Sequence, residues 1–118
     1  MILRNLSNPE VQATRYLAHG GGIAHMLLTT PTLKTLMFLA HASVPPGNRL
    51  LGHVDPMEEI YIIQKGRGLM QVGDEIREVQ MGDAIHIPIG QFHELTNTGG
   101  EELTLLVVAG LIPSTDDL

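Results

Sequence analysis

The segment GNRLLGHVDPMEEIYIIQKG, residues 47–66, places a histidine and several carboxylates directly before a run of apolar residues typical of a buried strand. His53, Asp55, Glu58 and Glu59 fall within seven positions. A histidine or carboxylate that borders a buried strand must be paired, protonated or bound to a metal, because an isolated charge is costly to remove from water. This segment therefore predicts a site as well as a strand.

Short apolar runs of strand length recur along the rest of the chain, separated by glycine and proline. Several are rich in Val and Ile, and none is long enough for the periodic pattern of a helix. The runs are MFLAHASV (37–44), EIYIIQ (59–64), GLMQV (68–72), IREV (76–79), AIHIPI (84–89) and LTLLVVAG (103–110). Many short strands at near-regular spacing predict an all-β antiparallel sandwich or barrel.

Two local signals refine this prediction. Gly73 and Asp74 indicate a two-residue hairpin, because both tolerate the positive φ angles of such turns. One helix is expected within Asn8–His19, with Asn8 as its N-cap before Pro9. Neither a linker nor an internal repeat interrupts the pattern, so residues 1–118 are expected to form one domain.

Composition narrows the classes of partner. The chain has 118 residues, of which 43% are hydrophobic, enough for one core. Its net charge of -6 repels nucleic acid and anionic membranes, so neither is an expected partner. The chain has no cysteine, which excludes disulfides and thiolate metal sites. The first residues lack the continuous apolar segment of a secretory signal, and Pro31 and Lys34 interrupt the longest apolar stretch, so a cytoplasmic location is expected.

The spacing of the polar residues allows a metal site. His53 and Asp55 share one face of an extended chain. A turn at Pro56 and Met57 would bring Glu59 near this pair, and another strand could deliver His93 to the same place. Two imidazoles with one or two carboxylates and no thiolate suit Fe(II), Mn(II), Ni(II) or Zn(II) in an open coordination sphere.

With these residues in place, the chain resembles a small single-domain cupin, since it matches both motifs of that superfamily. The first motif stands here as Gly47, His53, Asp55, Glu59 and Gly66, with every spacing kept and Asp55 in place of the second histidine. The second motif is matched completely by Gly82, Pro88, Gly90, His93 and Asn97. Together the two motifs and the segment between them span residues 47–97.

The resemblance implies a double-stranded β-helix, or jelly-roll, of six to eight antiparallel strands with a divalent metal in one mouth. The implied ligands are His53, Glu59 and His93, with Asp55 at the position of the family's remaining ligand. The resemblance also implies a homodimer. A dimer is favoured independently by the apolar segment LTLLVVAGLI (103–112), which is hydrophobic on both faces, and by a polar amino-terminal arm.

Asp55 departs from the family pattern and leaves two interpretations open. As a ligand or base, it would join Glu59 in offsetting the charge of a divalent metal, which would weaken capture of an acid substrate. As a turn residue, it would accept hydrogen bonds before Pro56.

Four other residues near the motifs have weaker signals. Tyr61 shares the face of Glu59 and could orient a substrate, although packing is the commoner role of a tyrosine in a barrel wall. Glu58 should point to the opposite face as surface charge. His86 is expected to pack between apolar neighbours, and His41 could line the pocket or face solvent.

The run HGGGIAH (19–25) could be mistaken for a phosphate loop, but it lacks the Lys and Ser or Thr of that motif. It predicts a mobile loop or a turn at a strand edge.

Two functions from different classes follow from the sequence. The leading prediction is a metal-dependent enzyme acting on a small organic molecule, a dioxygenase by family frequency or else an isomerase, decarboxylase or lyase. In it Asp55 and Tyr61 would be the candidate catalytic residues. The alternative is a noncatalytic module that binds or senses a small molecule.

Overall fold

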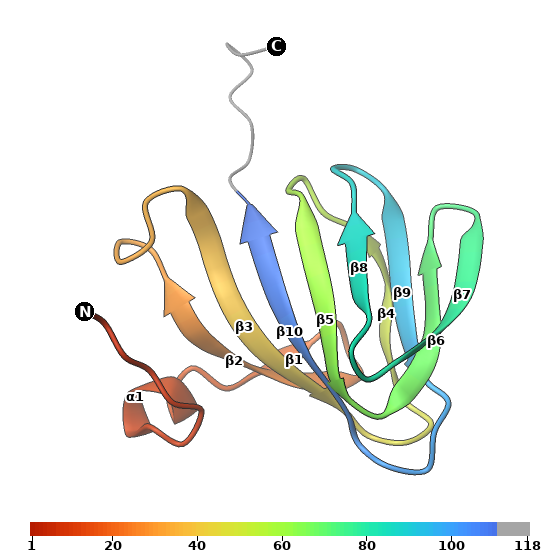
Figure 1. Cartoon of the computed structure of the whole chain (residues 1–118), viewed down its shortest axis with the longest axis horizontal. Helices are drawn as coiled ribbons and strands as arrows, with labels where there is room; N and C mark the ends of the chain where they lie inside the picture. The colour runs from red at the N-terminus through yellow and green to blue at the C-terminus, as the bar shows by residue number, and fades with distance from the viewer. Residues whose placement is uncertain (111–118) are drawn as a thin grey trace, which may run out of the picture.

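The computed structural model describes residues 1–110, which form ten antiparallel strands and one short helix (Figure 1). The helix is α1, Pro9–Gln12. The strands are β1 (Tyr16–Ala18), β2 (Gly22–Thr29), β3 (Leu36–Val44), β4 (Arg49–Val54), β5 (Glu59–Lys65), β6 (Arg67–Val72), β7 (Glu75–Gln80), β8 (Ala84–Ile87), β9 (Phe92–Asn97) and β10 (Leu103–Gly110). The all-β prediction is confirmed. No helix in this part of the chain is long and apolar enough to cross a membrane.

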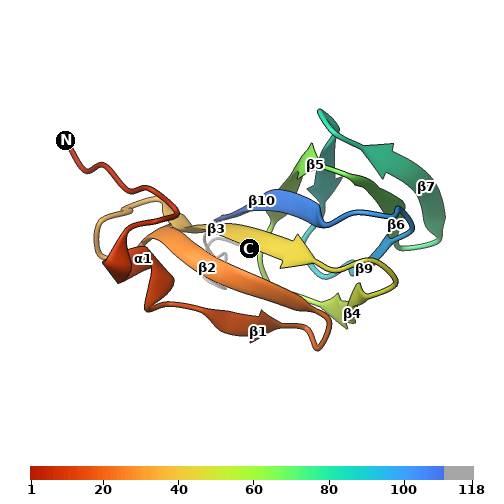
Figure 2. The ribbon, with the colours of Figure 1, turned by 90° about the horizontal axis from the view of Figure 1, so that it is seen from below.

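The strands form two sheets packed face to face in a jelly-roll arrangement. The larger sheet has the order β1-β2-β3-β10-β5-β8, and the smaller has the order β4-β9-β6-β7. β3 to β10 make up eight strands, while β1 and β2 extend the larger sheet on the side of α1, opposite β7 (Figure 2). The ten strands exceed the expected six to eight because the amino-terminal arm adds this pair.

The core lies between the two sheets and follows the alternation of the strands. In β10, residues 103, 105, 107 and 109 are buried, and the residues between them are only half-buried. Buried side chains of the smaller sheet, such as Leu50 and Leu95, close the core from the other side. The outward residues of β10, among them Leu106 and Val108, leave apolar surface on the outer face of the larger sheet. Residues 111 and 112 of the predicted apolar segment lie outside the described residues.

The predicted hairpin is present, with one correction to its backbone. Val72 pairs with Glu75 across a two-residue turn. Gly73 has a positive φ of 56°, but Asp74 does not share this conformation. The turn thus needs glycine only at its first central position.

The predicted helix is much shorter than Asn8–His19. It begins at Pro9 as expected, but it ends at Gln12 and the chain enters β1 at Tyr16. Asn8 makes no side-chain cap bond, because its Oδ1 accepts a hydrogen bond from the Asn5 amide instead. Tertiary packing sets this end, since the Thr14 hydroxyl oxygen accepts a hydrogen bond from the Met26 amide of β2.

Candidate metal centre

Strands from both sheets bring the four predicted ligands together at one end of the sandwich. His53 in β4 lies directly opposite His93 in β9. A bend after Asp55 carries the chain to the other sheet, where Glu59 is the first residue of β5. One ligand atom from each of these residues lies within 4.8 Å of all the others. The structure therefore brings together the four residues that the sequence singled out.

The contacts within the cluster are close. Oδ2 of Asp55 lies 3.0 Å from Nε2 of His53 and 3.5 Å from Nε2 of His93. Oε1 of Glu59 lies 3.5 Å from the same His93 nitrogen. Nε2 of both imidazoles and Oε1 of Glu59 are nevertheless buried without a hydrogen-bond partner, because these separations lack hydrogen-bond alignment. Three unpartnered donor atoms that point to one place fit a divalent metal.

The other ring nitrogens fix how the imidazoles face. Nδ1 of His53 lies 2.7 Å from the Leu51 carbonyl oxygen, and Nδ1 of His93 lies 3.0 Å from the Gln91 carbonyl oxygen. A carbonyl only accepts hydrogen bonds, so each neutral ring carries its proton on Nδ1 and leaves the Nε2 lone pair free. This is the arrangement of a histidine prepared to bind a metal.

The two carboxyl groups of the cluster have pKa values shifted in opposite directions. Burial, followed by hydrogen bonding with Asp55 and by its charge, raises the pKa of Glu59 to about 8. Burial also opposes ionisation of Asp55, but the hydrogen bond with Glu59 and the nearby imidazoles outweigh it and lower the pKa of Asp55. Burial lowers the pKa of His93. At neutral pH, the metal-free site therefore holds an ionised Asp55 and a protonated Glu59.

Asp55 lies in the cluster rather than acting only in a turn. No side-chain hydrogen bond from Asp55 to the backbone occurs within residues 1–110, although its backbone carbonyl accepts a hydrogen bond from the Gly90 amide. Its side chain reaches the two imidazoles in spite of being shorter than histidine. The geometry places this carboxylate where it could be a fourth ligand.

Tyr61 completes the buried side of the cluster. It is 2% exposed and lies on the same face of β5 as Glu59. Its ring is 5.9 Å from that of His93, edge to face. Burial, then the negative charge of Glu59 and Asp55, raises the pKa of this phenol, which stays neutral. Tyr61 is thus a neutral group beside the cluster, on the face of Glu59 that the alternation of the strand predicted.

The remaining predicted residues lie away from the cluster. Glu58 is exposed on the opposite face, as expected, and its Oε2 lies 2.6 Å from Nε2 of His86. The prediction that His86 packs between apolar neighbours is wrong: it is exposed, because β8 is an edge strand and His86 lies on its outer face. His41 is half-buried on the outer face of β3, opposite His25 of β2.

His19 is the residue of the site that the sequence analysis missed. It lies in the turn between β1 and β2, and its ring is stacked on that of His53 with centroids 3.4 Å apart and planes 11° apart. The prediction of a strand-edge turn in HGGGIAH is confirmed. Only a contact between distant segments marks His19, so the local sequence carried no signal for it.

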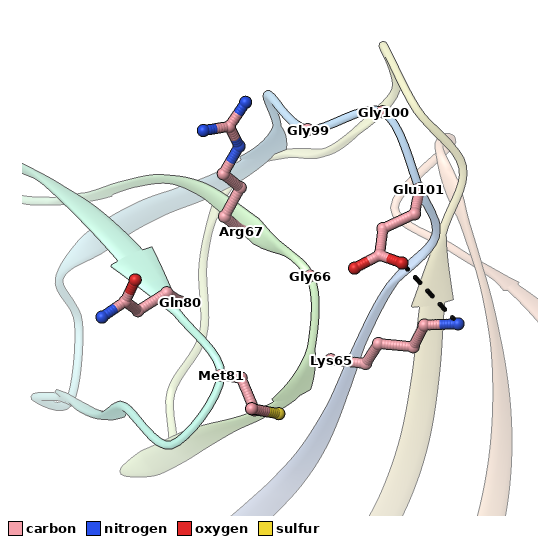
Figure 3. A pocket seen from close by; sticks show the side chains of 8 residues that line it. All are labelled: Lys65, Gly66, Arg67, Gln80, Met81, Gly99, Gly100 and Glu101. Carbon is pink, nitrogen blue, oxygen red and sulfur yellow. Dashed lines mark ion pairs between the residues drawn. The ribbon is translucent and has the colours of Figure 1, made fainter.

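Two surface pockets differ in their relation to the cluster. The one in Figure 3 lies at the far end of β5, where Lys65 pairs with Glu101 at 3.9 Å. Lys65 is six residues beyond Glu59 on an extended strand, about 20 Å away. None of the four cluster residues lines that pocket.

The second pocket opens between β7 and β8 and includes Val72 and Ile85 in its lining. Val72 is directly opposite His93 in the smaller sheet, and Ile85 is directly opposite Tyr61 in the larger one. Residues directly opposite each other in a ladder share a face, so the inner wall of this pocket is one strand away from the cluster.

The family model described as "Cupin domain" matches residues 40–109. An uncharacterised protein of Methanocaldococcus jannaschii is 40% identical over 93 residues, which cover 77% of this chain and 74% of that protein. The chain therefore belongs to the cupin family, and the matched residues run from the middle of β3 to the end of β10. Auxin-binding protein 1 of Arabidopsis thaliana is 26% identical over 124 aligned positions, covering 95% of this chain and 60% of that protein.

Solved structures share the fold. A predicted oxalate decarboxylase from Thermotoga maritima superposes with a TM-score of 0.75 at 26% identity, covering 82% of this chain and 90% of that one. Bacillus subtilis oxalate decarboxylase, whose Mn(II) centres are the subject of that structure, gives a TM-score of 0.73 at 23% identity, covering 89% of this chain and 30% of that one.

Proposed function

We propose that this cupin is a metal-dependent enzyme acting on a small organic molecule, with His53, Asp55, Glu59 and His93 as the metal ligands. The observation that supports the proposal most is the set of buried, unpartnered atoms Nε2 of His53, Nε2 of His93 and Oε1 of Glu59. Backbone carbonyls already orient the two histidine rings. Fe(II), Mn(II), Ni(II) or Zn(II) suits these nitrogen and oxygen donors. A bound metal of this kind would polarise a carbonyl or carboxylate oxygen or bind dioxygen.

The charge of the site favours an uncharged substrate. Asp55 and Glu59 together offset a divalent ion fully, whereas a site of histidines with one carboxylate keeps a positive charge. A dianion such as the oxalate named for two similar structures would gain less from this site. We therefore propose a neutral small molecule, with a dioxygenase reaction first by family frequency and an isomerase, decarboxylase or lyase reaction as the other outcomes.

The pocket between β7 and β8 supplies the approach for such a molecule. Its inner side is apolar where Met70, Val72 and Ile85 line it. Tyr61 lies between Ile85 and the ligands, so its neutral hydroxyl would orient a bound substrate. Asp55, which is ionised at neutral pH, would serve as the base if it does not bind the metal directly.

Metal analysis of protein purified without chelator or affinity nickel tests the proposal. We expect one equivalent of a divalent transition metal per chain. Oxygen uptake by the Fe(II)-loaded protein with neutral substrates then tests the dioxygenase reaction, while turnover with Mn(II) or Zn(II) alone would favour an isomerase or lyase. Failure to bind any of these metals at any loading would refute the proposed function.

A noncatalytic binding module is the second candidate, supported by the likeness to Auxin-binding protein 1, a relative named for binding rather than for a reaction. The metal-loaded protein would then bind a small molecule in the same pocket without converting it. Equilibrium dialysis followed by product analysis of the bound compound separates the two functions.

A further inference from the structure

His19 lies over one flank of the metal centre, although it comes from outside the strands that carry the ligands. Its ring covers one face of the His53 ring, and the edge of His93 lies 4.1 Å from the same ring, measured between centroids. His53 therefore has an aromatic neighbour on its face and another at an angle of 61°. Rotation of the His53 ring out of its plane would break both contacts.

The backbone of His19 is tied to the same ligand. The carbonyl oxygen of His19 accepts a hydrogen bond of 3.0 Å from the amide of Leu51. The carbonyl oxygen of Leu51 in turn lies 2.7 Å from Nδ1 of His53. One residue thus contacts His53 through its ring and orients, through Leu51, the acceptor that fixes the His53 tautomer.

The turn that carries His19 is seated directly on β4. A Cβ atom added to Gly21 would lie 1.7 Å from the carbonyl oxygen of Arg49, and one added to Gly22 would lie 2.7 Å from the side chain of Leu50. His19 itself has a φ of 48°, and no other non-glycine residue within 1–110 has a positive φ. A left-handed histidine held by a close backbone approach is a feature that the surrounding structure must impose.

The ring geometry excludes His19 from the ligand set. Lone pairs of ring nitrogens lie in the ring plane, and the two planes are nearly parallel at 11°. In-plane lone pairs of two stacked rings run side by side and do not converge on one ion. His19 is also absent from the group of ligand atoms that lie within 4.8 Å of one another.

We propose that His19 is a positioning residue of the metal centre, which acts through His53 by stacking on its ring and fixing its carbonyl partner. This inference rests on the proposed metal-binding function. It predicts that the aromatic ring at position 19 matters and that its nitrogens do not.

Two substitutions separate these properties. His19→Phe keeps a ring that can stack but has no nitrogen, and its thermal melt reports the cost of placing phenylalanine in the left-handed conformation. His19→Asn removes the ring and keeps a residue that tolerates the left-handed conformation, so backbone strain does not confuse the result. His86→Asn is the matched control for metal binding, since it makes the same change at an exposed histidine outside the ligand cluster.

Metal affinity is measured by titrating Mn(II) into each metal-free protein and following the free ion by electron paramagnetic resonance. His19→Asn should weaken binding about tenfold, as loss of an outer partner of a metal ligand typically does. His19→Phe should stay within about threefold of the parent, because stacking survives. His86→Asn should match the parent. Pulsed resonance of the Cu(II)-loaded parent should detect two imidazole ligands.

The metal-free protein gives an independent readout. Long-range ¹H–¹⁵N spectra of the histidine rings should show His53 as a single Nδ1–H tautomer in the parent and in both variants, because residue 19 keeps its backbone carbonyl. Broadened His53 ring signals in His19→Asn alone should report the loss of stacking. Thermal melts followed by circular dichroism verify that each variant is folded.

Equal Mn(II) affinity and unchanged His53 ring signals in His19→Asn would overturn the positioning role. Three coordinated imidazoles in the parent, with His19→Phe as weak as His19→Asn, would overturn it in favour of a direct ligand. A parent that binds no metal would refute the proposed function, whereas a parent that binds normally while His19→Asn is unaffected would refute only this inference.

Discussion

Metal binding should release a proton at neutral pH, because Glu59 holds one in the metal-free protein. With a pKa of about 8, Glu59 is about nine-tenths protonated at pH 7 and about one-tenth protonated at pH 9. A metal ligand must be ionised, so about 0.9 proton should leave at pH 7 and about 0.1 at pH 9. Apparent affinity should accordingly be about tenfold weaker at pH 7 than its limit above pH 9.

Isothermal titration of Mn(II) in two buffers of different ionisation enthalpy measures the protons released at each pH. Glu58→Gln is the matched control, since it removes the adjacent carboxyl group on the opposite face and should leave the release unchanged. Asp55→Asn should move the pH dependence lower but not abolish it, because burial is the larger cause of the raised Glu59 pKa. Tight binding with no proton release at pH 7 would refute the assignment of the proton to Glu59.

The other predictions concern stability, ligation and assembly. Glu59 stays protonated in the metal-free fold up to a pKa of about 8, whereas in the unfolded chain it ionises near 4.5. The melting temperature of the metal-free protein should therefore fall as the pH rises from about 4.5 to 8, and Glu59→Gln should flatten this decline. In competitive titrations, Asp55→His should bind metal at least as tightly as the parent, and Asp55→Ala should bind it less tightly. Equal metal affinity in the parent and both variants would instead indicate a site of three protein ligands. We propose a homodimer through the apolar outer face of the larger sheet, so light scattering should give about twice 12.8 kDa, with Leu106→Asp giving the single-chain mass. Gly66→Ala should destabilise the fold by about 1–3 kcal/mol, because φ is 85° and the new Cβ would lie 2.8 Å from a backbone oxygen, whereas Gly47→Ala, with open space, should cost less in a calorimetric melt.

The cluster could be predicted because the residues that form it stand at short, regular spacings within two sequence motifs. His53, Asp55 and Glu59 follow one another across a single bend, and the spacing of His93 from Gly90 fixes where the second strand begins. Alternation along strands then determines which side chains face inward, as it did for Glu58 against Glu59. The two motifs therefore predicted both the fold and the cluster.

Features that depend on contacts between distant segments could not be predicted in this way. The length of α1 is set by packing of the arm on β2, and the exposure of His86 follows from β8 being an edge strand, which depends on sheet order. The proximity of Asp55 to His93 depends on how two distant strands pack, which the sequence does not give. His19 required the seating of a turn on β4, which no spacing rule describes.

The close fit of the β1–β2 turn on β4 has a consequence for how this barrel could be altered. The family match begins at residue 40, so the turn lies in an amino-terminal segment outside the part of the chain that defines its likeness to other cupin relatives. Exchanging residues 1–29 between such relatives would change the surroundings of His53 while leaving every ligand in place. This amino-terminal segment is therefore a natural one for grafting when the metal preference of the barrel is to be changed and its ligands are to be kept.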